Sequence, residues 1–385
     1  MAESKPGQKG LDLEETLKAY FWQAGYFAVR GVPFRLDGED ITDIDLWLYE
    51  RPSALTRRRL ILDAKNKTKP KAAERLVWAR GLQSALGVDG AIVASTDKRP
   101  SSRRLAKAMG VSFLDGDAIA KLTTTSRLKT QDQYSSEQFD ELFRKVDTSR
   151  RGTDWRSALL DARTALLTSF GVHSANKALR VAGFFGEQAL LAAKGSSQAI
   201  TALRGYYSAC AYAAIGLDFV LSDLAFRSQD ERRNALINGI RFGHTESSEA
   251  LSTIRTAVAL VRQYAPNGNS VAKHVERTFH DEAGRVPAET VADYIARIST
   301  ADALHSTARE LERNAFNVKL LQFDALSIES RSLLGVFMDF HELSREKMAN
   351  AGGSSSAESA SKELTASASE TGSLFPEEEG GNHQT

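Results

Sequence analysis

Apolar and polar positions follow two different rhythms along the chain, and the change of rhythm divides it into zones. Up to about residue 122, short runs with a period of two, typical of strands, stand between runs with apolar residues three and four apart, typical of helices. Beyond the linker only the helical rhythm recurs. Four clear stretches are 158–170, 199–226, 250–264 and 320–340. The pattern predicts an α/β domain over 11–122, a linker over 123–136 and an all-helical domain over 137–348.

The two ends of the chain contain few apolar residues that could pack in a hydrophobic core. Residues 1–10 are polar and are expected to form a flexible N-terminus. Residues 349–385 are rich in Gly, Ser and Glu, which predicts a disordered acidic tail. The N-terminus has no apolar run of the kind that directs secretion, and no segment reaches the roughly 20 apolar residues of a membrane span. With a single cysteine, Cys210, the composition favours a cytoplasmic protein without a membrane partner.

The α/β domain is predicted element by element. An apolar stripe from Leu13 to Ala24 indicates a helix over 11–24 that ends at Gly25. Strands are expected over 41–49, 59–65, 90–95 and 111–114, and further helices over 73–86 and 102–109. The strand, helix, strand order from 59 to 95 predicts a parallel pair of strands within a mixed sheet that helices cover.

Acidic residues and a lysine stand on these elements in a pattern that suggests chemistry. Asp63 and Lys65 share one face of their strand because strand side chains repeat every two residues, and Asp45 occupies the preceding strand. Glu14 lies beside the apolar stripe of the first helix. Carboxylates of this kind bind Mg²⁺, and a lysine can orient a water or offset phosphate charge. We therefore expect catalytic Glu14, Asp45, Asp63 and Lys65, with Asp45 and Asp63 as metal ligands; Asp43 is the alternative to Asp45.

The same positions resemble a known family. The motifs are Leu13-Glu14, Gly25-Tyr26, Thr42-Asp43-Ile44-Asp45-Leu46, Leu60-Ile61-Leu62-Asp63-Ala64-Lys65 and Ala91-Ile92-Val93-Ala94-Ser95. Together they resemble the PD-(D/E)xK nuclease superfamily, particularly the Mrr-like restriction endonucleases and the archaeal Holliday junction resolvases. The resemblance covers under a third of the chain. It implies a restriction-endonuclease-like N-terminal domain, phosphodiester hydrolysis with Mg²⁺ or, in its place, Mn²⁺, and a role in host defence.

Three departures from the family pattern stand in this sequence. No proline precedes the strand aspartate, residues 50–58 lengthen the connection between the two strands, and Asp63 replaces the more usual glutamate. The helical domain matches no family by its motifs.

Charge favours a nucleic-acid partner. Residues 51–107 hold fifteen Lys and Arg against four acids in a chain whose overall charge is +1. A basic surface beside a carboxylate pair suits a polyanion whose phosphate must reach the metal. Two basic runs flank the predicted site and are expected to contact the phosphate backbone. Their members are Arg57, Arg58, Arg59, Lys67, Lys69 and Lys71.

Several alternatives stay open on the sequence alone. DNA is the expected substrate, but an RNA-cutting effector would use the same site. A non-catalytic nucleic-acid-binding or adaptor protein would keep the fold and lose the metal, and Asp45 and Asp63 would then form ordinary salt bridges with nearby arginines. A homodimer is expected because cutting two strands needs two sites. The helical domain or the tail is expected to contact a partner protein.

Overall fold

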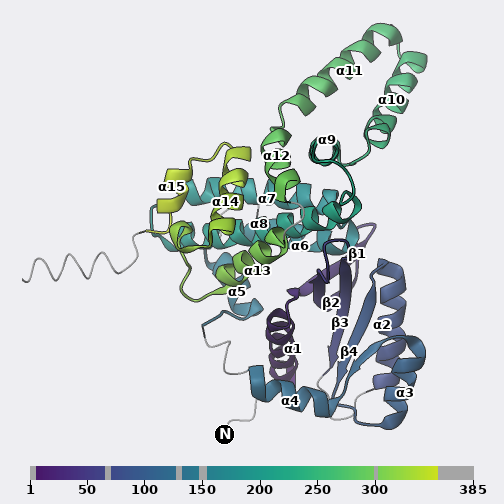
Figure 1. Cartoon of the computed structure of the whole chain (residues 1–385), viewed down its shortest axis with the longest axis vertical. Helices are drawn as coiled ribbons and strands as arrows, with labels where there is room; N and C mark the ends of the chain where they lie inside the picture. Colours follow the sequence, from purple (N-terminus) through teal and green to yellow (C-terminus); the bar gives the residue numbers. More distant parts are fainter. Residues whose placement is uncertain (1–5, 66–70, 127–131, 147–153, 299–301, 354–385) are drawn as a thin grey trace, which may run out of the picture.

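Two structural units make up the described part of the chain. The computed structural model describes residues 6–65, 71–126, 132–146, 154–298 and 302–353. A sheet with helices on both faces forms the lower part of the molecule in Figure 1, and a larger helical unit lies above it. The prediction of a disordered tail from residue 349 is wrong for its first residues, because 349 and 350 end the helix α15 (Arg345–Asn350) and Ala351 is buried. From 354 onward the predicted tail lies outside the described residues, as does part of the predicted linker. No helix among the described residues has the length and apolar character to cross a membrane.

Five strands form one mixed sheet in the order of the sequence. They are β1 (Phe27–Leu36), β2 (Glu39–Glu50), β3 (Arg58–Lys65), β4 (Gly90–Ser95) and β5 (Ser112–Leu114). The pairs β1–β2 and β2–β3 are antiparallel, whereas β3–β4 and β4–β5 are parallel. The parallel pair expected between 59 and 95 is therefore confirmed.

Helices cover both faces of this sheet. α1 (Pro6–Gln23) and α4 (Gly116–Ser126) lie on one face, where Leu17 packs with Leu62. α2 (Ala72–Leu86) and α3 (Pro100–Met109) lie on the other, where Leu76 packs with Ile61. Alternate residues of β3 thus serve two separate cores, as the period of two requires.

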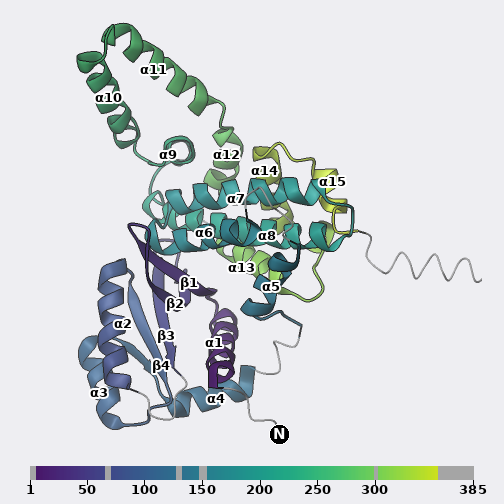
Figure 2. The same ribbon diagram turned by 180° about the vertical axis from the view of Figure 1, so that it is seen from behind.

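The helical unit begins where the sequence pattern places it. Its helices are α5 (Ser136–Val146), α6 (Trp155–Thr168), α7 (Val172–Leu191), α8 (Ser197–Asp223), α9 (Gln229–Phe242), α10 (Ser247–Tyr264), α11 (Gly268–Gly284), α12 (Ala288–Ile298), α13 (Ala303–Phe316), η1 (Phe323–Ala325), α14 (Ile328–Phe340) and α15 (Arg345–Asn350). α8 runs through its centre and is almost wholly buried. Figures 1 and 2 show α10 and α11 as a hairpin that projects away from the rest.

Several expectations about the elements need correction. Residues 27–36 form β1, which the sequence pattern does not predict, and Figure 2 shows it close to the helical unit. Residues 6–10, expected to be flexible, form the beginning of α1. Residues 116–126 form α4, so helical structure continues into the segment expected to be a linker. The stretch 320–340 is helical only from Ile328, apart from the short η1.

The core of the helical unit continues into the sheet. Trp47 and Tyr49 of β2 are fully buried, and both rings contact Phe170 just after α6, with centroids 5.0 and 5.6 Å apart. One cluster of buried residues includes these side chains together with α7 and α8. The strand that carries Asp45 is therefore fixed by both units.

Candidate active site where strands β2 and β3 end their pairing

Asp45 and Asp63 occupy facing positions on neighbouring strands. The antiparallel pairing of β2 and β3 ends at Leu46 and Leu62, and the two aspartates come next on either strand. Beyond this point the Asp45 side chain links the two strands, because its Oδ2 accepts a hydrogen bond from the backbone N–H of Ala64 at 2.7 Å. Facing positions of adjacent strands project side chains from the same face. The predicted juxtaposition of Asp45 and Asp63 thus follows from the register.

Lys65 joins the same group. Its Nζ lies 3.4 Å from Oδ2 of Asp45, and both side chains are only partly exposed, at 33% and 15%. Asp43, two residues earlier on β2, is exposed to solvent. The geometry therefore favours Asp45 over Asp43 as the acidic partner of Lys65.

The Asp63 carboxylate is held by a residue that the sequence did not single out. Arg75, in the first turns of α2, donates from Nε to Oδ2 of Asp63 at 2.8 Å and from Nη2 to Oδ1. Burial lowers the pKa of Arg75, and the negative charge of Asp45 acts against that lowering. The Arg75 guanidinium thus binds one of the two predicted metal ligands, Asp63, and lies within electrostatic reach of the other, Asp45. This contact matches the salt-bridge alternative left open above.

Glu14 approaches the group from α1. Burial raises the pKa of Glu14, the charge of Asp45 raises it further, and Lys65 lowers it, so Glu14 lies within electrostatic reach of both. Its Oε2 accepts a hydrogen bond from Nε of Arg30 on β1 at 2.8 Å. Arg30 is itself buried and also binds Glu15 at 2.7 Å. Sequence reasoning missed Arg30, which fixes Glu14 beside the strand ends.

Asp45 and Asp63 could supply only part of the ligand set of a divalent cation. Within the described residues, no three His, Cys, Asp or Glu side chains are arranged to hold a metal ion. Mg²⁺ is often bound through one or two carboxylates, with water completing its shell. Asp45 and Asp63 supply such a set on one face of the sheet, and the Arg75 guanidinium shows that this point attracts positive charge. A metal could bind both carboxylates only after Arg75 leaves Asp63.

The first predicted basic run lies away from this site. Arg57 is buried, with Nε 2.7 Å from Oδ2 of Asp218 in α8, so the predicted contact between Arg57 and phosphate is wrong. Arg58 is exposed and lies 3.4 Å from Glu50. Arg59 donates from Nη2 to the carbonyl of Gly87 at 2.7 Å. At about 3.3 Å per residue, Arg59 is roughly 20 Å from Lys65 along β3.

The second basic run is only partly described. Lys67 and Lys69 lie outside the described residues. Lys71 is exposed just before α2, and its Nζ lies 2.9 Å from Oε1 of Glu74. It precedes Arg75, the residue that binds Asp63, by four residues, which is about one turn of helix.

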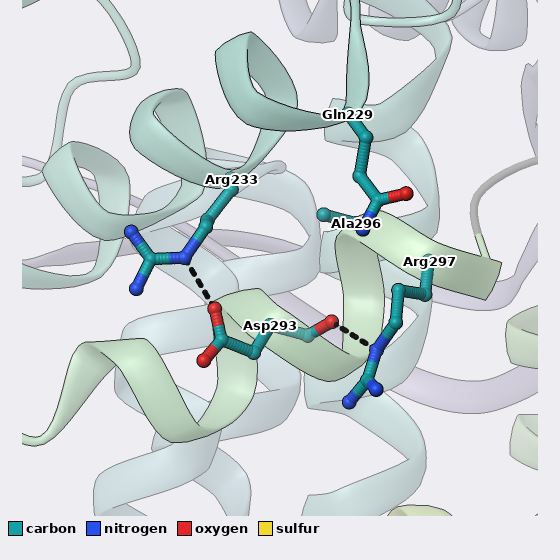
Figure 3. A pocket seen from close by; sticks show the side chains of 5 residues that line it. All are labelled: Gln229, Arg233, Asp293, Ala296 and Arg297. Atoms are coloured by element: carbon teal, nitrogen blue, oxygen red, sulfur yellow. Dashed lines mark hydrogen bonds and ion pairs between the residues drawn. The ribbon is translucent and has the colours of Figure 1, made fainter.

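A separate hollow lies in the helical unit, between α9 and α12 (Figure 3). Its volume is about 260 Å³, and its lining residues are Gln229, Arg233, Asp293, Ala296 and Arg297. Arg233 forms an ion pair with the Asp293 carboxylate, and Nε of Arg297 donates to the Asp293 carbonyl at 2.8 Å. The Asp293 carboxylate is therefore paired with Arg233, Arg297 is bonded to a backbone carbonyl, and none of these residues belongs to the candidate active site of β2 and β3.

Comparisons with known proteins give no relative for this chain. No family model, no curated protein and no solved structure matches it.

Proposed function

We propose that the chain is a Mg²⁺-dependent endonuclease that hydrolyses phosphodiester bonds, with DNA as its substrate. The observation that carries the proposal is the contact between Lys65 and Asp45, 3.4 Å apart, at the strand position that faces Asp63. Two carboxylates and a lysine at one point suit metal-assisted attack on a phosphodiester. The order α1, β1, β2, β3, α2, β4 supports a restriction-endonuclease-like fold for the N-terminal unit.

The proposed roles follow from the contacts of each side chain. Asp45 and Asp63 would hold the metal, which supplies a Lewis acid and lowers the pKa of bound water. The N–H of Ala64 fixes the Asp45 carboxylate. Nζ of Lys65 offsets phosphate charge and orients the attacking water. Glu14, whose pKa burial raises, is the group best placed to hold a proton at its carboxylate beside the site.

Cleavage of supercoiled plasmid and of single-stranded DNA in Mg²⁺ or Mn²⁺ tests this proposal directly. Asp45→Asn, Asp63→Asn and Lys65→Met are expected to abolish cleavage. Asp43→Asn is the matched control, because Asp43 is an exposed acid two residues along the same strand. If all three site variants cleave like the parent chain, the assigned site is wrong. A panel of double-stranded DNA, single-stranded DNA, branched DNA and RNA then separates a DNA endonuclease from an RNA-cutting effector.

The non-catalytic alternative also has an observation in its favour. Arg75 forms an ion pair with Asp63, so one of the two proposed metal ligands already has a cationic partner within the chain, as expected for a fold retained for docking. Calorimetry separates the two. An absence of Mn²⁺ binding together with salt-sensitive DNA binding would support the adaptor function, whereas Mn²⁺ binding that Asp63→Asn removes would support the nuclease. The homodimer, the partner protein and the role in host defence remain proposals that accompany the nuclease.

A further inference from the structure

One stripe of α2 combines two cations with an exposed tryptophan. Lys71 precedes the helix, and Arg75 and Trp78 follow at intervals of four and three residues, which places all three on one side of it. Arg75 marks this as the side turned toward Asp63. Trp78 is 43% exposed, whereas Leu76 and Ala79 on the inner side are buried.

Trp78 differs from the other three tryptophans of the chain. Trp47 and Trp155 are buried, and Trp22 is covered by the guanidinium groups of Arg309 and Arg313 at 4.8 and 4.5 Å from its ring. Among the described residues, Trp78 has neither an aromatic ring nor a cation stacked against it. An exposed indole at a charged surface is the residue type that stacks on nucleobases.

The net charge of the segment that contains Trp78 favours an anionic partner. The described segment 71–110, which contains α2 and α3, has eight basic side chains and three acidic ones, an excess of positive charge although five of the basic side chains form ion pairs with acids within or outside the segment. The basic residues are Lys71, Arg75, Arg80, Lys98, Arg99, Arg103, Arg104 and Lys107. A second copy of this face would meet like charge, whereas a polyanion is attracted to it. Nucleic acid is therefore the occupant that the charge favours.

Trp78 also lies close to the candidate active site. Three residues of α-helix advance about 4.5 Å, so Trp78 follows Arg75 by less than one turn. Arg75 contacts Asp63 directly. A phosphate at Asp45 and Asp63 would thus leave its neighbouring nucleotide within reach of the indole.

We infer that Trp78, flanked by Lys71 and Arg75, is a stacking platform for an unpaired base next to the cleaved phosphate. This inference rests on the proposed function for the position of that phosphate. A base within a duplex is already stacked on both faces, so an indole can stack only on a base that is single-stranded or displaced. The substrate class is therefore single-stranded or locally unpaired nucleic acid.

Binding without metal tests the inference independently of cleavage. The full chain in EDTA is titrated with a fluorescent thymidine oligonucleotide and with a duplex of the same length. Stacking contributes about 1–3 kcal/mol per base, so Trp78→Ala is expected to weaken single-strand binding roughly 5- to 150-fold and duplex binding much less. Trp78→Phe should retain most of the affinity. Val77→Ala is the matched control, because Val77 is exposed on another side of the same helix.

Three results would overturn the inference. Single-strand affinity that survives Trp78→Ala shows that the indole does not stack on substrate. An equal loss for duplex and single strand shows a loss of general affinity. A parent dimer that Trp78→Ala converts to a monomer in analytical ultracentrifugation assigns this face to a second copy. A chain that cleaves nothing but binds as expected overturns the proposed endonuclease and leaves the stacking platform in place.

Discussion

Tyr49 donates a hydrogen bond from its hydroxyl to Oδ2 of Asp218 at 2.6 Å, and this contact joins the sheet to the central helix of the helical unit. Both residues are almost completely buried, and Arg57 binds the same carboxylate at 2.7 Å. Tyr49 stands four residues after Asp45 on β2. The helical unit therefore holds the strand that carries the candidate site, which makes the relative position of the two units part of the geometry of that site.

Replacing this tyrosine should lower stability without removing a ring. Tyr49→Phe keeps the contact with Phe170 and deletes one hydrogen bond to a buried carboxylate, which Arg57 still neutralises. Hydrogen bonds to charged groups contribute about 1.5–3 kcal/mol, so the free energy of unfolding should fall by that amount in urea titrations. Tyr264→Phe is the control, because Tyr264 is 74% exposed and should change little. Equal stability of both variants would show that the contact between Tyr49 and Asp218 contributes nothing.

The alternation of apolar and polar residues predicts four of the five strands. It does not predict β1, and the reason lies in the residues of that strand. Gly31 and Pro33 interrupt the rhythm of residues 27–36, and proline has no N–H for a ladder. The structure tolerates Pro33 because β1 is the edge strand. The edge position of β1 depends on how all five strands pair, so the sequence of residues 27–36 alone does not predict it.

The strand residues of the candidate site could also be predicted from the sequence, whereas their arginine partners could not. Asp45, Asp63 and Lys65 follow from strand periodicity and from the register of adjacent strands. Arg75 and Arg30 reach their carboxylates from a helix and from the unpredicted strand, so their contacts depend on tertiary packing. The predicted phosphate contact of Arg57 was wrong because the sequence of a basic run does not show whether a side chain faces solvent or a buried aspartate.

Glu14 and Glu15 should affect the pH dependence of stability in opposite directions. Burial raises the pKa of Glu14, so its contribution to stability is present at low pH and is lost as the pH rises through its folded pKa. Burial would also raise the pKa of Glu15, but Lys18, the backbone N–H of Ser136 and Arg30 outweigh it and lower that pKa. The contribution of Glu15 is therefore lost as the pH falls.

Glu14→Gln and Glu15→Gln separate these two contributions. Relative to Glu14→Gln, the parent chain should lose stability as the pH rises between about 3 and 7. Relative to Glu15→Gln, it should gain stability over the same range. Urea titrations at several pH values give both differences. Differences with the same slope would show that the two neighbouring carboxyl groups do not occupy the distinct environments described.

Replacing two helical glycines by alanine should change the stability of the protein in opposite directions. A Cβ at Gly205 of α8 would lie 2.6 Å from Cδ1 of the buried Phe185, so Gly205→Ala overpacks the contact between α7 and α8. Overpacking costs about 1–3 kcal/mol. A Cβ at Gly81 of α2 meets nothing within 4 Å, so Gly81→Ala should stabilise by about 0.5–1 kcal/mol through helix propensity. Thermal unfolding measures both, and a tolerated Gly205→Ala would mean that the two helices are farther apart than described.

Arg75 should compete with a divalent cation for Asp63. Its guanidinium binds both carboxylate oxygens, and charge-assisted hydrogen bonds of this kind contribute about 1.5–3 kcal/mol. Arg75→Ala frees that carboxylate, so the dissociation constant for Mn²⁺ should fall about tenfold or more in calorimetry at low ionic strength. Arg104→Ala on α3 also removes one positive charge but does not touch Asp63, and it should leave the constant nearly unchanged. If both variants bind Mn²⁺ like the parent chain, Arg75 does not occupy the position of the cation, and the metal must use other oxygens than those of Asp63.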